Sequence, residues 1–309
     1  MQVTGIKERR VADPDVTSLD LAIGAALNAL SLSNHSRFDI DLVLYCSITR
    51  TVTDKRTQMV PSMASLVSDA IGTTRARSFD VANACAGMAT GLVIADRMIK
   101  AGAARRVLIV SGEKISAITE TAVREISDGY DPQFAALTVG DSGCALIIDD
   151  AGTPFDGIEH ASLTTAAEAA QLCVAMPSDR SEGVAMYTDN KRMHSESRYT
   201  QGLQYIQLKL AEMGGDIDDF DYLIHHQFSM VAIDYLRDLA VNKVFGKKMP
   251  PELNVLPYLG NTSSTALFVV LEQHLRTREF QAGDRVMLVP SASGMVYGLI
   301  SMTIGEELL

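Results

Sequence analysis

The chain of 309 residues contains no tryptophan, only 6% aromatic residues and only four cysteines. Those cysteines are Cys46, Cys85, Cys144 and Cys173, which form neither a Cys-x-x-Cys pair nor the spacing of a zinc site. No apolar run is long enough to span a bilayer, and the polar N-terminus lacks the apolar stretch of a signal peptide. We therefore expect reduced thiols, no bound metal and a cytoplasmic location.

Basic charge is also scarce, with 27 Lys and Arg against 38 Asp and Glu and a net charge of −11. An acidic chain without a basic stripe is a poor ligand for nucleic acid or for an anionic membrane surface, so we expect neither partner. The remaining composition, 47% hydrophobic and 21% charged residues, is typical of a globular enzyme with a large core.

Buried strands and helices alternate along the chain, which indicates an α/β protein with helices on both faces of its sheets. We expect two similar halves, residues 1–150 and 151–309, packed into one sandwich. Residues 164–200 are polar and irregular, and we expect a cap or loop there. The expected strands are residues 41–47, 77–82, 106–112, 157–163, 220–225, 285–290 and 298–304, and residues 135–148 are expected to hold a loop that runs into a further buried strand. The expected helices are 17–30, 59–71, 86–100, 201–213, 229–239 and 261–276.

One cysteine, Cys85, lies where a predicted strand meets a predicted helix, in the run Asp80-Val81-Ala82-Asn83-Ala84-Cys85-Ala86-Gly87. The unpaired N–H groups and the positive dipole end of a helix N-terminus favour a thiolate, the form that attacks carbonyls. Small neighbouring residues leave room for a substrate. Taken alone, the same residue fits equally well as a small apolar core side chain.

Two further motifs follow strands in the second half. His225-His226-Gln227 ends an apolar strand, at the edge where α/β proteins bind ligands. A histidine there can donate or accept a proton, although an isolated histidine is more often structural. Asn261, in Leu259-Gly260-Asn261-Thr262-Ser263, is placed either to cap a helix or to act as an uncharged donor.

A fourth motif, Ser291-Ala292-Ser293-Gly294-Met295, is a turn of small residues between two apolar strands. Small residues allow a reacting group to approach the backbone closely, although a simple tight turn has the same composition.

In this order and spacing, the motifs resemble those of the type III β-ketoacyl-acyl-carrier-protein synthases, condensing enzymes of the thiolase superfamily. The resemblance covers essentially the whole chain and also includes Thr4-Gly5-Ile6-Lys7-Glu8-Arg9-Arg10 and Gly140-Asp141-Ser142-Gly143. It implies a thiolase-like layered sandwich (αβαβα) of two pseudo-duplicated halves. The first half would carry the nucleophile, and the second half the histidine and the asparagine.

The resemblance also implies a role for each motif. Cys85 would take an acyl group from a thioester, and His226 and Asn261 would bind the carbonyl of a malonyl-type extender while it loses carbon dioxide. The backbone N–H groups of Cys85 and Ser293 would form the oxyanion hole. His225 is given a structural role, because neighbouring strand residues face opposite ways. No cofactor is implied beyond an acyl donor on coenzyme A or an acyl carrier protein.

The chain also departs from the family pattern, most clearly where the family binds the nucleotide of coenzyme A. Family members carry a Trp-containing stretch and an Arg before the Gly-Ile-Lys-Glu-Arg segment; here there is no Trp, and the Arg position corresponds to Val3. A second nucleotide-binding Arg maps to Gln133. After His226-Gln227 the family has Ala-Asn, where this chain has Phe228-Ser229. These losses predict a specialised relative rather than the housekeeping initiator of fatty acid synthesis.

Three residues are predicted to line the substrate pocket: Val60, Phe228 and Gly294. Val60 takes the place of a bulky pocket-gating side chain that the family supplies from a dimer partner, so we expect room for a longer acyl group. The resemblance also implies a homodimer. An acyl carrier protein is a further expected partner, with Lys191, Arg192 and Arg198 as candidate contacts.

Two other functions remain open from the sequence. In one, Cys85 is acylated but passes the acyl group to an alcohol or an amine. In the other, the chain is a non-catalytic partner subunit of a ketosynthase heterodimer.

Overall fold

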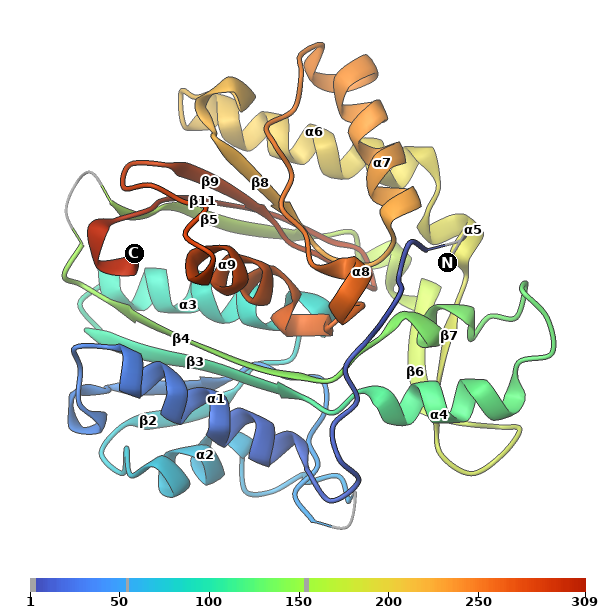
Figure 1. Cartoon of the computed structure of the whole chain (residues 1–309), viewed down its shortest axis with the longest axis horizontal. Coiled ribbons are helices and arrows are strands. Elements are labelled where there is room, and N and C mark those ends of the chain that lie inside the picture. The colour runs from blue at the N-terminus through green and yellow to red at the C-terminus, as the bar shows by residue number, and fades with distance from the viewer. Residues whose placement is uncertain (1–3, 54–55, 153–155) are drawn as a thin grey trace.

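The computed structural model describes residues 4–53, 56–152 and 156–309, and Val3 lies outside them. Two mixed sheets are stacked with helices α3 (Gly87–Lys100) and α9 (Ala266–Arg276) between them (Figure 1). Helices α1 (Ser18–Leu32) and α2 (Met63–Ile71) cover the outer face of one sheet, and α6 (Glu196–Glu212) and α7 (Met230–Leu239) cover that of the other. This is the expected αβαβα order of layers.

The first sheet has the order β2 (Arg77–Asp80), β1 (Leu42–Tyr45), β3 (Arg106–Glu113) and β4 (Ser142–Asp149). Strand β1 is parallel to both of its neighbours, and β4 is antiparallel to β3. Alternate residues separate the two faces, as the pleat requires. Val43 and Tyr45 pack with α1 and α2, whereas Leu42 and Leu44 pack with α3.

The second sheet contains β8 (Tyr222–His225), β9 (Arg285–Val289), β11 (Val296–Thr303) and β5 (Gly157–Thr165), in that order. A short strand, β10 (Ser291–Ala292), folds back on the start of β11. Here too the faces separate by alternation: Met287 packs in the α6 and α7 layer, and Leu288 packs in the core with α3 and α9. Both sheets therefore contain a parallel pair followed by an antiparallel strand.

Helix ends follow the expected chemistry. Thr17 and Asp20 form a capping box at the start of α1, and Ser62 caps α2 through a bond to the Ser65 N–H. Gly72 ends α2 with a φ of 78°, the left-handed conformation that glycine adopts without strain. Helix α2 starts at Met63 and not at Met59 as predicted, because Ser62 is the cap.

Residues 164–200 hold more regular structure than the sequence predicts. They contain a two-stranded hairpin, β6 (Cys173–Pro177) and β7 (Val184–Thr188), the short helix α5 (Asn190–Met193) and the first turn of α6. The hairpin packs on α4 (Ser116–Glu125) beside the two main sheets (Figure 1). Its strands have few buried residues, so the apolar alternation that normally signals a strand is missing.

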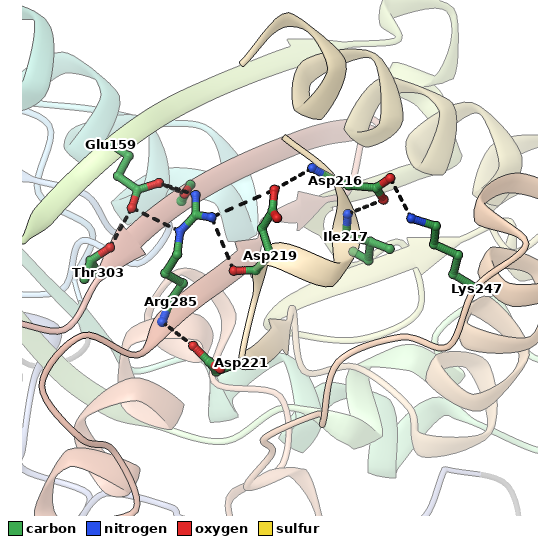
Figure 2. A network of polar contacts seen from close by, with 9 residues as sticks. Glu159, Asp216, Ile217, Asp219, Asp221, Lys247, Arg285 and Thr303 are labelled. Atoms are coloured by element: carbon green, nitrogen blue, oxygen red, sulfur yellow. Dashed lines mark hydrogen bonds and ion pairs between the residues drawn. The ribbon is translucent and has the colours of Figure 1, made fainter. Parts of the chain in front are cut away.

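A polar network lies at the end of the second sheet where β9 starts and β11 ends (Figure 2). The Arg285 guanidinium donates to both carboxylate oxygens of Glu159, at 3.3 and 2.7 Å, and to the Asp219 carbonyl at 3.3 Å. Glu159 also accepts from Ser301 at 2.7 Å, and Lys247 binds Asp216 at 2.7 Å. The network ties β5, β9 and β11 to the turn that precedes β8.

In the described part of the chain, no helix combines the length and the apolar character needed to cross a membrane.

Candidate active site

Cys85 lies in a single 3₁₀ turn, η2 (Ala84–Ala86), between β2 and α3. Ala84 has a φ of 44°, a left-handed conformation that is costly for any residue with a side chain. Helix α3 then starts at Gly87, where an added Cβ would lie 2.3 Å from the Cys46 carbonyl oxygen. Close packing of α3 on β1 therefore fixes the position of the Cys85 turn.

Cys85 is half-buried as a residue, and its side chain packs beside the apolar cluster of Ala86, Ala292 and Val296. The Ser263 hydroxyl donates to its Sγ at 3.8 Å. Burial raises the pKa of Cys85 to about 12, and the bond from Ser263 only partly opposes this. Burial of the sulfur therefore opposes the thiolate that the helix N-terminus is expected to favour.

His226 follows the last residue of β8, and its N–H donates to the Val289 carbonyl at 3.2 Å. The side chain is buried, and this burial lowers the pKa of His226 to about 4. The imidazole is therefore neutral near pH 7 and carries one N–H donor. Its ring lies at a stacking angle of 16° to Phe228, with the ring centroids 6.1 Å apart.

The residues around His226 hold the strand end in place. Gln227 accepts hydrogen bonds from the N–H groups of Val255 and Leu256, at 3.1 and 3.2 Å, and donates to the His225 carbonyl at 2.8 Å. His225 is also buried, with its Nδ1 atom 3.4 Å from a carboxylate oxygen of the buried Glu252.

The Asn261 backbone is held on both sides. Its N–H donates to the Thr138 carbonyl and its own carbonyl accepts from the Gly140 N–H, each at 2.9 Å. The side-chain oxygen accepts at 2.9 Å from the N–H of Ser263, the first residue of the 3₁₀ turn η7 (Ser263–Thr265) that precedes α9. Since the carboxamide oxygen is used in this way, the amide end is the one available to donate to a substrate.

Ser293 lies between β10 and β11, in a turn where Gly294 and Met295 have φ values of 75° and 48°. The η2 turn of Cys85 packs against both β10 and η7. Cys85, the Asn261–Ser263 segment and the start of the Ser293 turn therefore meet at one end of the two sheets. His226 reaches the same end of the second sheet, because it bonds to the last residue of β9, which leads into β10.

The three predicted pocket residues differ in their placement. Phe228 lies between two imidazoles, stacked on His226 and, at 5.7 Å and 6°, on His194 from the segment after α5. Gly294 belongs to the Ser293 turn and packs near Ala170. Val60 is 81% exposed in the single chain, so it does not line a pocket within its own subunit.

Several polar residues near Cys85 were not predicted from the sequence. Ser263 contacts the thiol directly, and Glu113, at the end of β3, accepts a hydrogen bond from Ser264 in the next position of η7. A charged residue closing an otherwise apolar strand, as in Val107–Glu113, is a signal that could have indicated Glu113. His194 had no comparable signal, because it lies in the irregular segment.

Gln133, which takes the position of a nucleotide-binding Arg in the family, is fully buried. Its amide nitrogen donates to Glu125 at 2.6 Å. Among the proposed carrier contacts, Arg198 is paired with Glu168 at 2.6 Å, whereas Lys191 is exposed.

The layered fold, with a cysteine at a strained strand-to-helix turn and with a histidine and an asparagine reaching the same end of the sheets, is that of the thiolase-fold condensing enzymes. Residues 79–167 match the family model of 3-oxoacyl-[acyl-carrier-protein] synthase III, and residues 210–304 match the model of its C-terminal part. Together the two matches cover more than half of the chain. The chain belongs to this family, as a divergent member.

Similar proteins agree with this assignment. The β-ketoacyl-[acyl-carrier-protein] synthase III of Oceanobacillus iheyensis is 28% identical over 308 residues, covering 98% of this chain and 88% of that protein. The synthase of Bacillus pumilus is 26% identical, with the same coverage.

Two solved structures have a similar fold. A cysteine-to-serine variant of Xanthomonas campestris OleA with bound lauric acid and lauroyl-CoA has a TM-score of 0.84 at 25% identity, covering 98% of this chain and 87% of that one. The 3-oxoacyl-(acyl carrier protein) synthase III of Xanthomonas oryzae has a TM-score of 0.80 at 25% identity, covering 97% and 86%. These relatives are condensing enzymes, and this chain is a transferase of the same general class.

Proposed function

We propose that this protein is a β-ketoacyl synthase that loads an acyl group onto Cys85 and condenses it, with loss of carbon dioxide, with a malonyl-type thioester. One observation carries the proposal: Ser263 contacts the Cys85 sulfur through its hydroxyl and the Asn261 carboxamide through its N–H. The nucleophile and one of the two extender-binding groups are thus joined by a single residue.

The first half-reaction is acyl transfer to sulfur. The Cys85 thiol gives up its proton, and Sγ attacks the carbonyl carbon of the donor thioester. The negative charge that develops on the oxygen is stabilised by the backbone N–H groups of Cys85 and Ser293. When the carbonyl re-forms, the donor's thiolate leaves and takes up the proton, so that acyl-Cys85 and a free thiol remain.

The second half-reaction forms the carbon–carbon bond. His226 and Asn261 donate hydrogen bonds to the thioester carbonyl of the extender, and the electrons of the breaking carbon–carboxylate bond move into an enolate as carbon dioxide leaves. The enolate carbon attacks the acyl carbonyl on Cys85, which releases the β-ketoacyl thioester and the cysteine thiolate. A neutral His226 suits this role, because a neutral imidazole retains a donor without a charge to bury.

The acyl donor is proposed to differ from that of the housekeeping synthases, which supports a role in specialised metabolism. A buried Gln133 offers no cation to a nucleotide, and Phe228 fills space beside His226 where the family has alanine. The exposed and modest-sized Val60 is proposed to reach the pocket of a second subunit and leave room there for a long or bulky acyl group.

A homodimer is part of this proposal. Strand β2 is an edge strand whose residues alternate between exposed and half-buried, and its Phe79 is 40% exposed. Met59 and Val60, in the segment leading to α2, are 83% and 81% exposed. An unpaired edge next to exposed apolar side chains favours pairing with a second copy.

The test is intact-mass spectrometry after incubation with acyl thioesters of increasing chain length, each on coenzyme A and on a carrier protein. We expect one acyl mass on the wild-type chain and none on Cys85→Ala. Cys173→Ala, which removes another partly exposed thiol, is the matched control and should retain the adduct. No adduct with any donor would contradict the proposal and favour a non-catalytic subunit.

A further inference from the structure

The Glu113 carboxylate is fully buried in the first sheet. It accepts hydrogen bonds from the N–H groups of Ile48 and Thr49, at 3.1 and 3.2 Å, and from the hydroxyls of Thr49 and Ser264, at 3.1 and 2.5 Å. Among the described residues, no basic side chain forms an ion pair with it. Burying such a group is costly, and an apolar side chain would fill the same space without that cost.

A chain of serine hydroxyls leads to this carboxylate. The Gly112 N–H donates to Ser47 at 2.7 Å, Ser47 contacts Ser111 at 2.8 Å, and Ser111 contacts Ser264 at 2.7 Å. Each hydroxyl has one proton, and Ser264 donates its own to Glu113, so the carboxylate sets the direction of the chain. Ser47 donates to Ser111, Ser111 to Ser264, and Ser264 to Glu113. With this direction, every hydroxyl proton has an acceptor.

The Ser264 end of this hydrogen-bond chain lies beside the Cys85 turn, because η7 packs against η2. Ser264 adjoins Ser263, whose φ of 58° is left-handed and requires support from its surroundings. Gly87 is the first residue of the helix that follows Cys85. The Cβ of Ser264 lies 3.4 Å from the position that a Cβ would take at Gly87. A shift of Ser264 would therefore move both Ser263 and the Cys85 turn.

We propose that Glu113 is a positioning residue for the Cys85 site: by binding Ser264, it fixes η7 so that Ser263 directs its hydroxyl to Cys85 and its N–H to Asn261. The Asn261 backbone is already held by Thr138 and Gly140, so the Glu113 contact fixes the other end of the same short segment. Glu113 itself touches neither Cys85 nor the proposed extender groups through a hydrogen bond. This inference rests on the proposed function of the site.

The experiment compares three serine-to-alanine variants of the full chain. Ser264→Ala removes the bond to Glu113, and Ser263→Ala removes the contact with Cys85. Ser301→Ala is the matched control, because Ser301 is fully buried and donates to Glu159 at 2.7 Å, away from the Cys85 site. For each variant, three quantities are measured: the rate of Cys85 alkylation by iodoacetamide, located by peptide mass spectrometry; kcat and KM for condensation; and the melting temperature.

We expect Ser264→Ala to slow alkylation of Cys85 about threefold or more, as Ser263→Ala does, because the hydroxyl that stabilises the thiolate is lost or misdirected. The double variant should be no slower than the slower single one, since both act through one contact. For condensation, kcat should fall about tenfold with KM within about twofold. Ser264→Thr, which restores the hydroxyl, should recover part of the rate.

A lower melting temperature in Ser264→Ala, with alkylation and kcat unchanged, would make the contact merely structural and overturn the inference. Equal slowing by Ser264→Ala and Ser301→Ala would do the same. If the wild-type chain neither acylates nor condenses, the proposed function fails, and the alkylation rates still decide whether Glu113 and Ser264 position the thiol.

Discussion

The two sheets hold their parts of the site by different means. In the first, the Cys85 turn is fixed by packing: Gly87 and Gly91 lie so close to Cys46 that an added Cβ would come within 2.3 and 2.6 Å of its atoms. In the second, His226 is fixed by a backbone hydrogen bond to the last residue of β9. Asn261 lies in the loop before η7 and is fixed by backbone hydrogen bonds to Thr138 and Gly140, ahead of β4. A nucleophile positioned by packing is sensitive to added volume, whereas donors positioned by hydrogen bonds are sensitive to lost polar groups.

The largest expected effect comes from the loss of His226 or Asn261, the two proposed donors to the extender. His226→Ala and Asn261→Asp should each lower the rate of malonyl-thioester decarboxylation by about 100-fold or more, the usual cost of losing one oxyanion donor. Asn261→Asp keeps the acceptor for the Ser263 N–H. Acylation of Cys85 should stay within about threefold, and carbon dioxide release and intact mass measure the two steps. If either variant lost acylation as well as decarboxylation, His226 and Asn261 would not act on the second step alone.

The buried state of His226 predicts a pH dependence of stability. The pKa of His226 is about 4 in the folded chain, against an ordinary value of 6.5 for histidine, so the unfolded chain takes up the extra proton at a higher pH than the folded chain does. This group's contribution to the free energy of unfolding is present above pH 6.5 and lost between 6.5 and 4. The loss is up to about 3 kcal/mol. Chemical denaturation of the wild type and of His226→Gln between pH 6.5 and 4 measures this loss. The same change in the free energy of unfolding with pH in both proteins would contradict the prediction.

A larger side chain at Gly87 tests whether close packing positions the Cys85 turn. Gly87→Ala should displace the start of α3 and destabilise the fold by about 1–3 kcal/mol, because the new methyl meets backbone. It should also slow acylation of Cys85. Gly24→Ala in α1 is the control: nothing lies within 4 Å of its added Cβ, so it should be neutral or stabilising by about 0.5–1 kcal/mol. Similar melting temperatures for the two variants would contradict the claim that close packing at Gly87 fixes the Cys85 turn.

A smaller effect is expected at Phe228. Phe228→Ala opens the space between His194 and His226, and should raise kcat/KM for coenzyme A thioesters about threefold relative to short pantetheine thioesters. Steady-state kinetics with matched acyl groups on the two carriers measures the ratio. An equal change for both carriers would mean that the ring does not select the donor.

The smallest effect is expected in the network of Figure 2, far from the site. Lys247 is a surface cation paired with Asp216 and Asp218. Lys247→Ala should change the free energy of unfolding by less than about 1 kcal/mol and leave kcat and KM unaltered, as is usual for exposed ion pairs. A clear kinetic effect in this variant would show that changes at this end of the second sheet reach the site at the other end.

The sequence predicted those elements correctly whose pattern has one physical cause. The strand before Cys85, the glycine that ends α2 and the core helices between the sheets follow from periodicity and capping. The hairpin of β6 and β7 did not, because its strands bury few residues. The raised pKa of Cys85 and the contact between Ser264 and Glu113 were also missed, since desolvation and contacts over 151 positions depend on the tertiary fold.

The most direct test of the account is a single turnover on preloaded enzyme. Acyl-Cys85 is prepared with one equivalent of acyl thioester, isolated, and mixed with a malonyl thioester that carries an isotopic label in its free carboxylate. The account predicts one labelled carbon dioxide and one β-ketoacyl thioester for each acyl group lost from Cys85. Release of the acyl group as a simple ester, amide or acid, with the label still on the malonyl thioester, would contradict it.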